Sequence, residues 1–249
     1  MTVLTRKNTL TRSIDDHAND ERVIVANIDQ MAIVIAAANP EPRAGLVDRA
    51  LVVAYDQGIK PIIVMTKKDL ADGDEFLKIY KDLDIPVFKT DKSSDLTLLQ
   101  KELAGKITVF MGHSGVGKST LVNNLLAGSL SKSENSVIEN AHRATGDVNE
   151  VTGRGRHTTS SAIALPLSSS FEGENFGWII DTPGVRSFGI AHIQPSRVLS
   201  AFPEFNEAIA NCQKNCTHNE PGCALNSWPS LTNQHIARLA SLRRVLSVG

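Results

Sequence analysis

The stretch GHSGVGKST at Gly112–Thr120 decides the fold of this 249-residue chain. It follows the pattern of Gly, four residues, then Gly-Lys-Ser, in which the glycines let backbone N–H groups curl around phosphate oxygens. The apolar run ITVFM at 107–111 predicts a strand before it, and the apolar spacing of 119–127 predicts a helix after it. A glycine-rich turn of no function would not need these flanks, so the stretch predicts a phosphate-binding loop.

We expect the whole loop to contact the phosphates of a nucleotide. Its lysine would reach the β and γ phosphates and take part in catalysis, and its serine would ligate Mg²⁺. The residues predicted to bind are Gly112, His113, Ser114, Gly115, Val116, Gly117, Lys118, Ser119 and Thr120.

Working outward from the loop, apolar runs alternate with amphipathic segments, which predicts an α/β fold with a parallel-rich sheet. Strands are expected at 30–37, 61–65, 86–88, 162–167 and 177–180, and helices at 46–55, 74–83, 96–103 and 235–246. The polar stretch 128–161 shows no periodicity and is expected to be a switch loop. We predict three units: an N-terminal segment 1–22, a nucleotide-binding domain 23–190 and a small, mainly helical domain 191–249.

A second phosphate-site motif, DTPG, begins at Asp181 directly after the strand 177–180. An acid at the carboxyl end of a strand can hold Mg²⁺, often through water, and Gly184 would offer its N–H to the γ phosphate. A plain Asp-Pro-Gly turn is the alternative, and the phosphate loop favours the functional interpretation.

The motif TKKD follows the strand 61–65 and resembles the guanine-specificity motif of GTPases. Its carboxylate could accept hydrogen bonds from guanine N1–H and the exocyclic amine, for which adenine offers no matching donor pair. The base-binding residues would be Thr66, Lys67, Lys68 and Asp69; a solvated basic loop is the alternative. Because this motif precedes the phosphate loop, the chain is predicted to be a circularly permuted GTPase. Thr90-Asp91-Lys92 would be the second base-contacting loop.

The first switch is expected in the segment GRGRHTT at 153–159. Thr158 or Thr159 could complete Mg²⁺ coordination, and Thr159 is placed in the predicted site. After DTPG, where many GTPases carry a water-orienting Gln, the residue is Val185, which cannot hydrogen-bond the nucleophile. His157 is therefore the candidate for orienting water; a solvated or RNA-facing histidine is the alternative.

A metal site is predicted from the three cysteines of the chain, which all lie near one histidine. Three thiolates and one imidazole make a closed tetrahedral zinc site of structural type. The ligands would be Cys212, Cys216, His218 and Cys223; scattered buried cysteines are the alternative.

Composition excludes several classes of protein. The net charge of -1 gives no overall attraction to nucleic acid, so RNA binding would need local basic patches. The longest apolar run, 31–38, is too short to cross a bilayer, which needs about 20 residues. We therefore expect a cytoplasmic protein with no membrane contact.

These motifs together, with NEPGCAL at 219–225 and ANIDQ at 26–30, resemble the bacterial ribosome small subunit-dependent GTPase A family. The resemblance implies GTP hydrolysis stimulated by the small (30S) ribosomal subunit late in its maturation, with the zinc domain contacting rRNA. Family members carry an N-terminal OB-fold, of which residues 3–12 would be a remnant. The zinc ligands are spaced slightly more closely here than in the family.

Two other functions remain open: a GTP-regulated binding module with negligible chemistry, and a P-loop ATPase or kinase. GTP and GDP, the small subunit and its rRNA are the expected partners of a monomer. Candidate phosphate contacts to RNA are Arg6, Lys7, Arg12, Arg154, Arg156, Arg238, Arg243 and Arg244.

Overall fold

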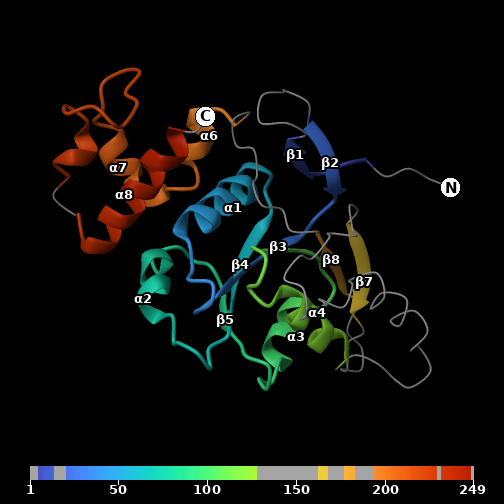
Figure 1. Cartoon of the computed structure of the whole chain (residues 1–249). Coiled ribbons are helices and arrows are strands. Elements are labelled where there is room, and N and C mark those ends of the chain that lie inside the picture. The colour runs from blue at the N-terminus through green and yellow to red at the C-terminus, as the bar shows by residue number, and fades with distance from the viewer. Residues whose placement is uncertain are drawn as a thin grey trace.

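A six-stranded sheet forms the centre of the molecule in the computed structural model (Figure 1), which describes residues 5–13, 21–127, 162–167, 177–182, 193–228 and 231–247. The strand order is β5-β4-β3-β6-β8-β7. In chain order the strands are β3 (Gln30–Ala36), β4 (Lys60–Thr66), β5 (Val87–Lys89), β6 (Ile107–Met111), β7 (Ile163–Leu167) and β8 (Gly177–Asp181). All neighbours are parallel except β7 and β8, so the predicted parallel-rich sheet is confirmed with one antiparallel edge strand.

The central strand β3 explains why the sequence shows a continuous apolar run. All seven of its residues are buried, because helices cover both faces of the sheet. β3 pairs with β4 from Gln30↔Lys60 to Ala36↔Thr66, which brings the carboxyl ends of both strands to one edge. The phosphate loop follows β6 at the same edge, since β6 also runs parallel to β3.

Helices form a layer on each face. The helices α3 (Thr97–Leu103) and α4 (Lys118–Ala127) pack on one face, where Leu99, Leu121 and Leu125 are buried. The helix α1 (Ala44–Asp56) covers the other face (Figure 1). The nucleotide motifs therefore sit on a sheet that is held from both sides.

The prediction of one helix over 74–83 is wrong for the second half of that range. α2 (Asp74–Leu77) ends after one turn and continues as the 3-10 helix η1 (Lys78–Tyr80). Tyr80, Leu83 and Ile85 all turn into the core, and Pro86 disfavours helical backbone for the residue before it. Helical backbone therefore ends before Pro86, and the chain continues into β5 (Val87–Lys89).

The N-terminal segment forms a separate two-stranded antiparallel sheet, β1 (Thr9–Ser13) with β2 (Glu21–Ala26). It attaches to α1, since the Thr9 N–H donates to Gln57 Oε1 at 3.3 Å and Leu10 is fully buried. The boundary expected between residues 22 and 23 falls inside β2.

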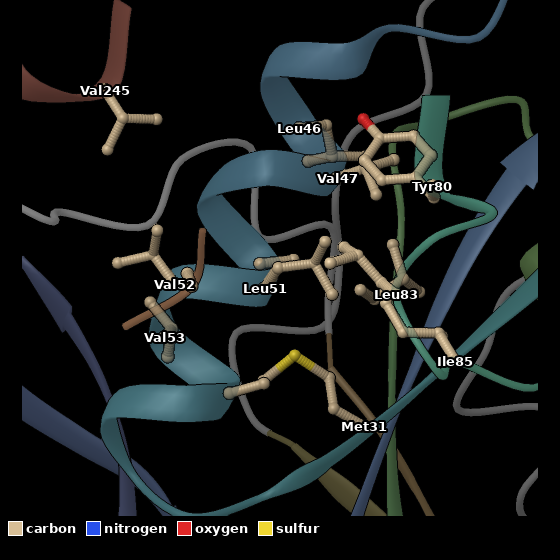
Figure 2. Close-up of a cluster of buried hydrophobic side chains, with 14 of the residues drawn as sticks. Met31, Leu46, Val47, Leu51, Val52, Val53, Tyr80, Leu83, Ile85 and Val245 are labelled. Atoms are coloured by element: carbon tan, nitrogen blue, oxygen red, sulfur yellow. The ribbon is translucent and has the colours of Figure 1, made fainter. Parts of the chain in front are cut away.

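The C-terminal part is mainly helical, as predicted, and packs on α1. It contains α6 (Pro195–Leu199), η2 (Pro203–Phe205), α7 (Asn206–Ile209), η3 (Ala224–Asn226) and α8 (Asn233–Leu246). Figure 2 shows α1 side chains between Met31 of β3 and Val245 of α8. Phe202, Phe205 and Leu242 are fully buried in this same cluster. No helix within the described ranges is long and apolar enough to span a membrane.

One acid of α3, Glu102, should make the stability of the protein depend on pH. Burial acts to raise the pKa of Glu102, but hydrogen bonds from Lys106 and Gln30 outweigh it and leave the pKa below the ordinary 4.5. The folded state thus binds the Glu102 proton less readily than the unfolded state. Its stabilising contribution is present above pH 4.5 and is lost as the pH falls through the lower, folded pKa.

We therefore expect Glu102→Gln to lose stability at pH 7 but little below the folded pKa of Glu102. Urea unfolding of both proteins at several pH values between neutral and acid measures this. Glu75→Gln is the matched control, because Glu75 also pairs with a lysine yet its side chain is 88% exposed. An equal loss at every pH would contradict the expectation.

Candidate functional site

The phosphate loop lies between β6 and α4, as the sequence predicts. Gly115 and Gly117 have φ of 81° and 88°, a left-handed conformation that L side chains rarely adopt. At Gly112 a Cβ atom would lie 2.5 Å from the carbonyl oxygen of Val34. Glycine is therefore required at these positions by backbone geometry and by the close approach of β3.

The lysine of the loop contacts the DTPG motif directly. Lys118 Nζ forms an ion pair with Asp181 and donates to the Thr182 carbonyl oxygen at 3.2 Å. Both charged side chains are nearly buried, with exposed fractions of 10% and 13%. Thr182 Oγ1 donates to the Phe110 carbonyl oxygen at 2.9 Å, which ties the end of β8 to β6. The lysine predicted to bind phosphate and the carboxylate predicted to hold Mg²⁺ thus lie in direct contact.

The TKKD motif lies against the phosphate loop although 42 residues separate Asp69 from Gly112 along the chain. Thr66 is buried, and its hydroxyl hydrogen-bonds the Val116 carbonyl oxygen. Lys67 Nζ donates to the Gly115 carbonyl oxygen at 2.8 Å, which leaves its aliphatic stem as the part that could cover a base. Asp69, the predicted base-reading residue, is exposed.

Thr90 and Asp91 of the expected second base loop lie beside TKKD. The Lys68 N–H donates to the Thr90 carbonyl oxygen at 3.1 Å, and Lys68 Nζ lies 3.8 Å from Asp91 Oδ2. Hydrogen bonds from Ser93 hold the pKa of the Asp91 carboxyl below its ordinary value. The structure thus brings the two loops together.

Sequence reasoning missed the segment that follows β3. The Asn39 carbonyl oxygen accepts a hydrogen bond from Lys67 Nζ, and Pro40 Cδ would lie 3.8 Å from a Cβ placed on Gly115. The signal was present as an Asn-Pro pair directly after a buried strand, where ligand-binding loops of parallel sheets begin. This segment leads straight into α1.

Several predicted site residues lie outside the described residues: His157, Thr158, Thr159 and Gly184, with Arg154 and Arg156 of the same switch segment. Val185, which stands where many GTPases carry the Gln, also lies outside them. Their roles stay predictions. In the phosphate loop itself, Ser114, Ser119 and Thr120 are exposed, whereas His113 is half-buried.

The predicted metal ligands converge. Ligand atoms of Cys212, Cys216, His218 and Cys223 all lie within 4.8 Å of one another, and this cluster could hold a metal ion. Cys212 Sγ lies 3.6 Å from His218 Nδ1 and 3.8 Å from Cys223 Sγ. Burial lowers the pKa of His218, which favours the neutral imidazole that binds metals.

One candidate RNA contact is wrong. Arg238 is only 2% exposed, and its guanidinium pairs with Asp48 and Glu204 inside the protein. It is therefore not free to contact a phosphate of RNA. Arg244 also lies near Asp48, with 3.8 Å between its Nη1 and Asp48 Oδ2, but its side chain is 54% exposed.

A phosphate loop placed after a base-reading motif, on one edge of a parallel-rich sheet, defines a circularly permuted P-loop GTPase fold. The sequence profile of the RsgA GTPase family matches residues 3–191. The chain belongs to this family.

Relatives named small ribosomal subunit biogenesis GTPase RsgA include those of Ectopseudomonas mendocina and Pseudomonas aeruginosa. The first is 36% identical over 234 residues and the second 36% over 236. Each match covers 90% of this chain but 63% of the relative, so the chain spans less than two thirds of their length.

Solved structures agree on the fold. YjeQ from Thermotoga maritima superposes with a TM-score of 0.66 at 26% identity, over 99% of this chain and 78% of that one. YloQ, described as a circularly permuted GTPase, gives a TM-score of 0.62 at 25% identity, over 99% of this chain and 74% of that one.

Proposed function

We propose that this protein binds and hydrolyses GTP and acts in late maturation of the small ribosomal subunit. The observation that carries the proposal is the meeting of Lys118, Asp181 and the TKKD motif around one glycine-rich loop. Support for the ribosomal role comes from relatives named for small-subunit biogenesis. Cytoplasmic location, action as a monomer and rRNA contact belong to the same proposal.

In the proposed mechanism, Lys118 leaves Asp181 and binds the β and γ phosphates, while backbone N–H groups of the loop hold the remaining oxygens. Asp181 and Ser119, joined by Thr159, would hold Mg²⁺, which supplies positive charge to the phosphates. Gly184 would donate its N–H to the γ phosphate. His157 would orient the attacking water, because Val185 has no hydrogen-bonding group.

We further propose that the Cys/His cluster binds a structural Zn²⁺. With Zn–S bonds of about 2.3 Å and a Zn–N bond of about 2.0 Å, a tetrahedron places its sulfurs about 3.8 Å apart and sulfur and nitrogen about 3.5 Å apart. The separations of 3.8 Å between Cys212 and Cys223 and 3.6 Å between Cys212 and His218 are close to these values, and Cys223 lies somewhat farther from His218, at 3.9 Å. Metal analysis of the purified protein should find zinc in equimolar amount.

The decisive experiment is GTP turnover by the purified chain with and without small ribosomal subunits, with ATP as the control. Strong stimulation confined to GTP is the expected result. Binding of GTP without turnover, even with subunits, would instead favour a GTP-regulated binding module. Unchanged stimulated turnover in His157→Ala would show that the histidine is not the water-orienting group.

Guanine selectivity gives a separate prediction at Asp69. Asp69→Asn should weaken GDP binding by about a hundredfold, because the amide can no longer accept both guanine donors. The same variant should gain affinity for xanthosine diphosphate, since an amide N–H₂ can donate to the xanthine C2 carbonyl. Titration with fluorescent GDP, XDP and ADP measures the shift.

The neighbouring variant Asp72→Asn is the matched control, as Asp72 lies just beyond the motif and should leave all three affinities unchanged. Equal binding of ADP and GDP by the unmodified chain would favour a P-loop ATPase or kinase over the proposed function.

A further inference from the structure

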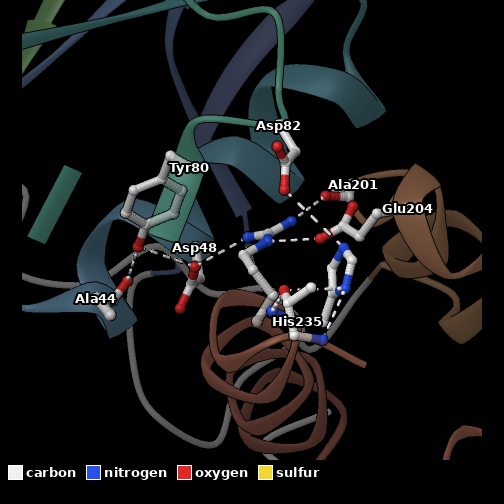
Figure 3. Close-up of polar contacts among 9 residues, drawn as sticks. Ala44, Asp48, Tyr80, Asp82, Ala201, Glu204 and His235 are labelled. Atoms are coloured by element: carbon white, nitrogen blue, oxygen red, sulfur yellow. Dashed lines mark hydrogen bonds and ion pairs between the residues drawn. The ribbon is translucent and has the colours of Figure 1, made fainter. Parts of the chain in front are cut away.

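A buried charged cluster joins the C-terminal helix to the nucleotide-binding layer. We name it the Arg238 cluster: Arg238 of α8, Asp48 of α1, Glu204 of η2 and Tyr80 of η1. Arg238 donates from Nε to Glu204 at 2.7 Å and from Nη1 to Asp48 at 3.2 Å. Figure 3 shows Asp48, Tyr80 and Glu204 converging from three elements.

The cluster is closed to solvent. Asp48 is fully buried, and the Tyr80 hydroxyl donates to its Oδ1 at 3.1 Å. Arg238 also donates to the Ala201 carbonyl oxygen at 2.7 Å, and its guanidinium carbon lies 4.1 Å from the Phe202 ring centre. Buried charges that lose their partners are costly, so this arrangement strongly favours one position of α8 against α1.

Apolar packing acts on the same helix face. Arg238, Leu242 and Val245 follow one another at helical spacing and are all buried, as are Phe202 and Phe205 beneath them. None of these residues is a candidate metal ligand. The attachment of α8 therefore includes apolar contacts made by residues that are not ligands, although Cys223 and Leu225 of the Cys/His loop belong to the same core.

The Cys/His loop, residues 212–226, attaches to α8 in turn. Arg243 Nε donates to the His218 carbonyl oxygen at 2.8 Å, and its Nη2 contacts Asn226 Oδ1. Most of the loop's non-ligand side chains are exposed, while Cys223 and Leu225 are buried. The loop thus depends on α8 for its position, whereas α8 has contacts that do not depend on the loop.

We propose that the Arg238 cluster, and not the metal, fixes α8 to the nucleotide-binding layer, and that the metal organises only the loop 212–226. Arg238 is then a positioning residue: through α8 and Arg243 it sets where the metal loop stands relative to α1. Since α1 begins just after the Asn39-Pro40 segment against the phosphate loop, the metal loop and nucleotide site share one rigid support. The part of this proposal that concerns the metal rests on the proposed zinc site.

Native-state hydrogen exchange of the full chain, before and after removal of zinc with a chelator, tests the proposal. Amides of 212–226 should exchange at least tenfold faster after chelation, whereas those of α8 and α1 should keep their rates. Loss of α8 protection together with the loop would overturn the proposal. If chelation leaves the exchange of the 212–226 amides unchanged, the part of the proposal that concerns the metal is overturned, and so is the proposed zinc site.

The part of the proposal that concerns the Arg238 cluster is tested by Arg238→Met in protein that retains its zinc. Exchange of α8 amides should accelerate by about a hundredfold or more. Ile236→Ala is the matched control on the same helix, because that side chain is 55% exposed, and its α8 rates should stay within a few fold of the unmodified chain. Should Arg238→Met fail to fold, Asp48→Asn removes one charge with little change of shape. Unchanged α8 rates in both variants would overturn the proposal.

Discussion

Replacing Lys118 with Ala is expected to lower GTP turnover by about a thousandfold. A single preorganised donor to developing negative charge contributes roughly a hundredfold to a thousandfold in rate, and in the proposed mechanism this lysine would bring a full charge to two phosphates. Its nearly buried position strengthens the effect, since the site has little water to replace the lost cation. Steady-state and single-turnover measurements with GTP, with and without small subunits, would show the loss.

Measurements of folding and stability should separate this effect from misfolding. Lys118→Ala removes the only cation paired with Asp181 in the described part of the chain, so a modest loss of stability is expected as well. Circular dichroism and thermal unfolding identify that component, and Lys81→Ala, at an exposed lysine, is the matched control. Turnover within tenfold of the unmodified chain would contradict the assignment of Lys118 to the phosphates.

The local features of the site were predictable because their causes are local. A phosphate loop needs glycines at fixed positions, and Gly115 and Gly117 carry the positive φ that this requirement implies. The buried strand β3 shows as an unbroken apolar run for the same reason. Four metal ligands within twelve residues also converge without long-range information, although the ion that they bind stays a proposal.

The features that were missed depend on residues far apart in the chain. Arg238 and Asp48 are 190 residues apart, so no window of sequence contains the pair. On α8 the arginines look like a solvated basic face, yet Arg238 lies on the buried stripe with Leu242. A usable signal was Asp48 itself, a charge inside the apolar pattern of α1, which needs a partner when buried.

A second large effect is expected at this pair. Arg238→Met should reduce the free energy of unfolding by about 3–5 kcal/mol, because it leaves the buried carboxylate of Glu204 without its cation and Asp48 with only the half-exposed Arg244, whose Nη1 lies 3.8 Å from Asp48 Oδ2. The variant with Arg238→Met, Asp48→Asn and Glu204→Gln together should recover most of that loss, as no uncompensated charge remains. Urea unfolding of the single and triple variants measures both.

The pH dependence gives the sharper test of whether charge is the cause. Burial already raises the pKa of Asp48 above its ordinary 3.8, while contacts with Ser241, Arg238 and Tyr80 oppose the rise. Without Arg238 the pKa must rise further, because one opposing contact is gone. A carboxyl with a raised folded pKa is most favourable to folding when protonated, so its destabilising effect appears as the pH rises through that pKa.

The deficit of Arg238→Met should therefore be largest at neutral pH and shrink on acidification, whereas the triple variant should show no such trend relative to the unmodified chain. A deficit that stays constant from pH 7 down to the ordinary Asp pKa of 3.8 would mean that lost packing on Phe202, and not the unpaired charge, destabilises the protein. The buried arginine would then act on α8 mainly through its hydrophobic contacts.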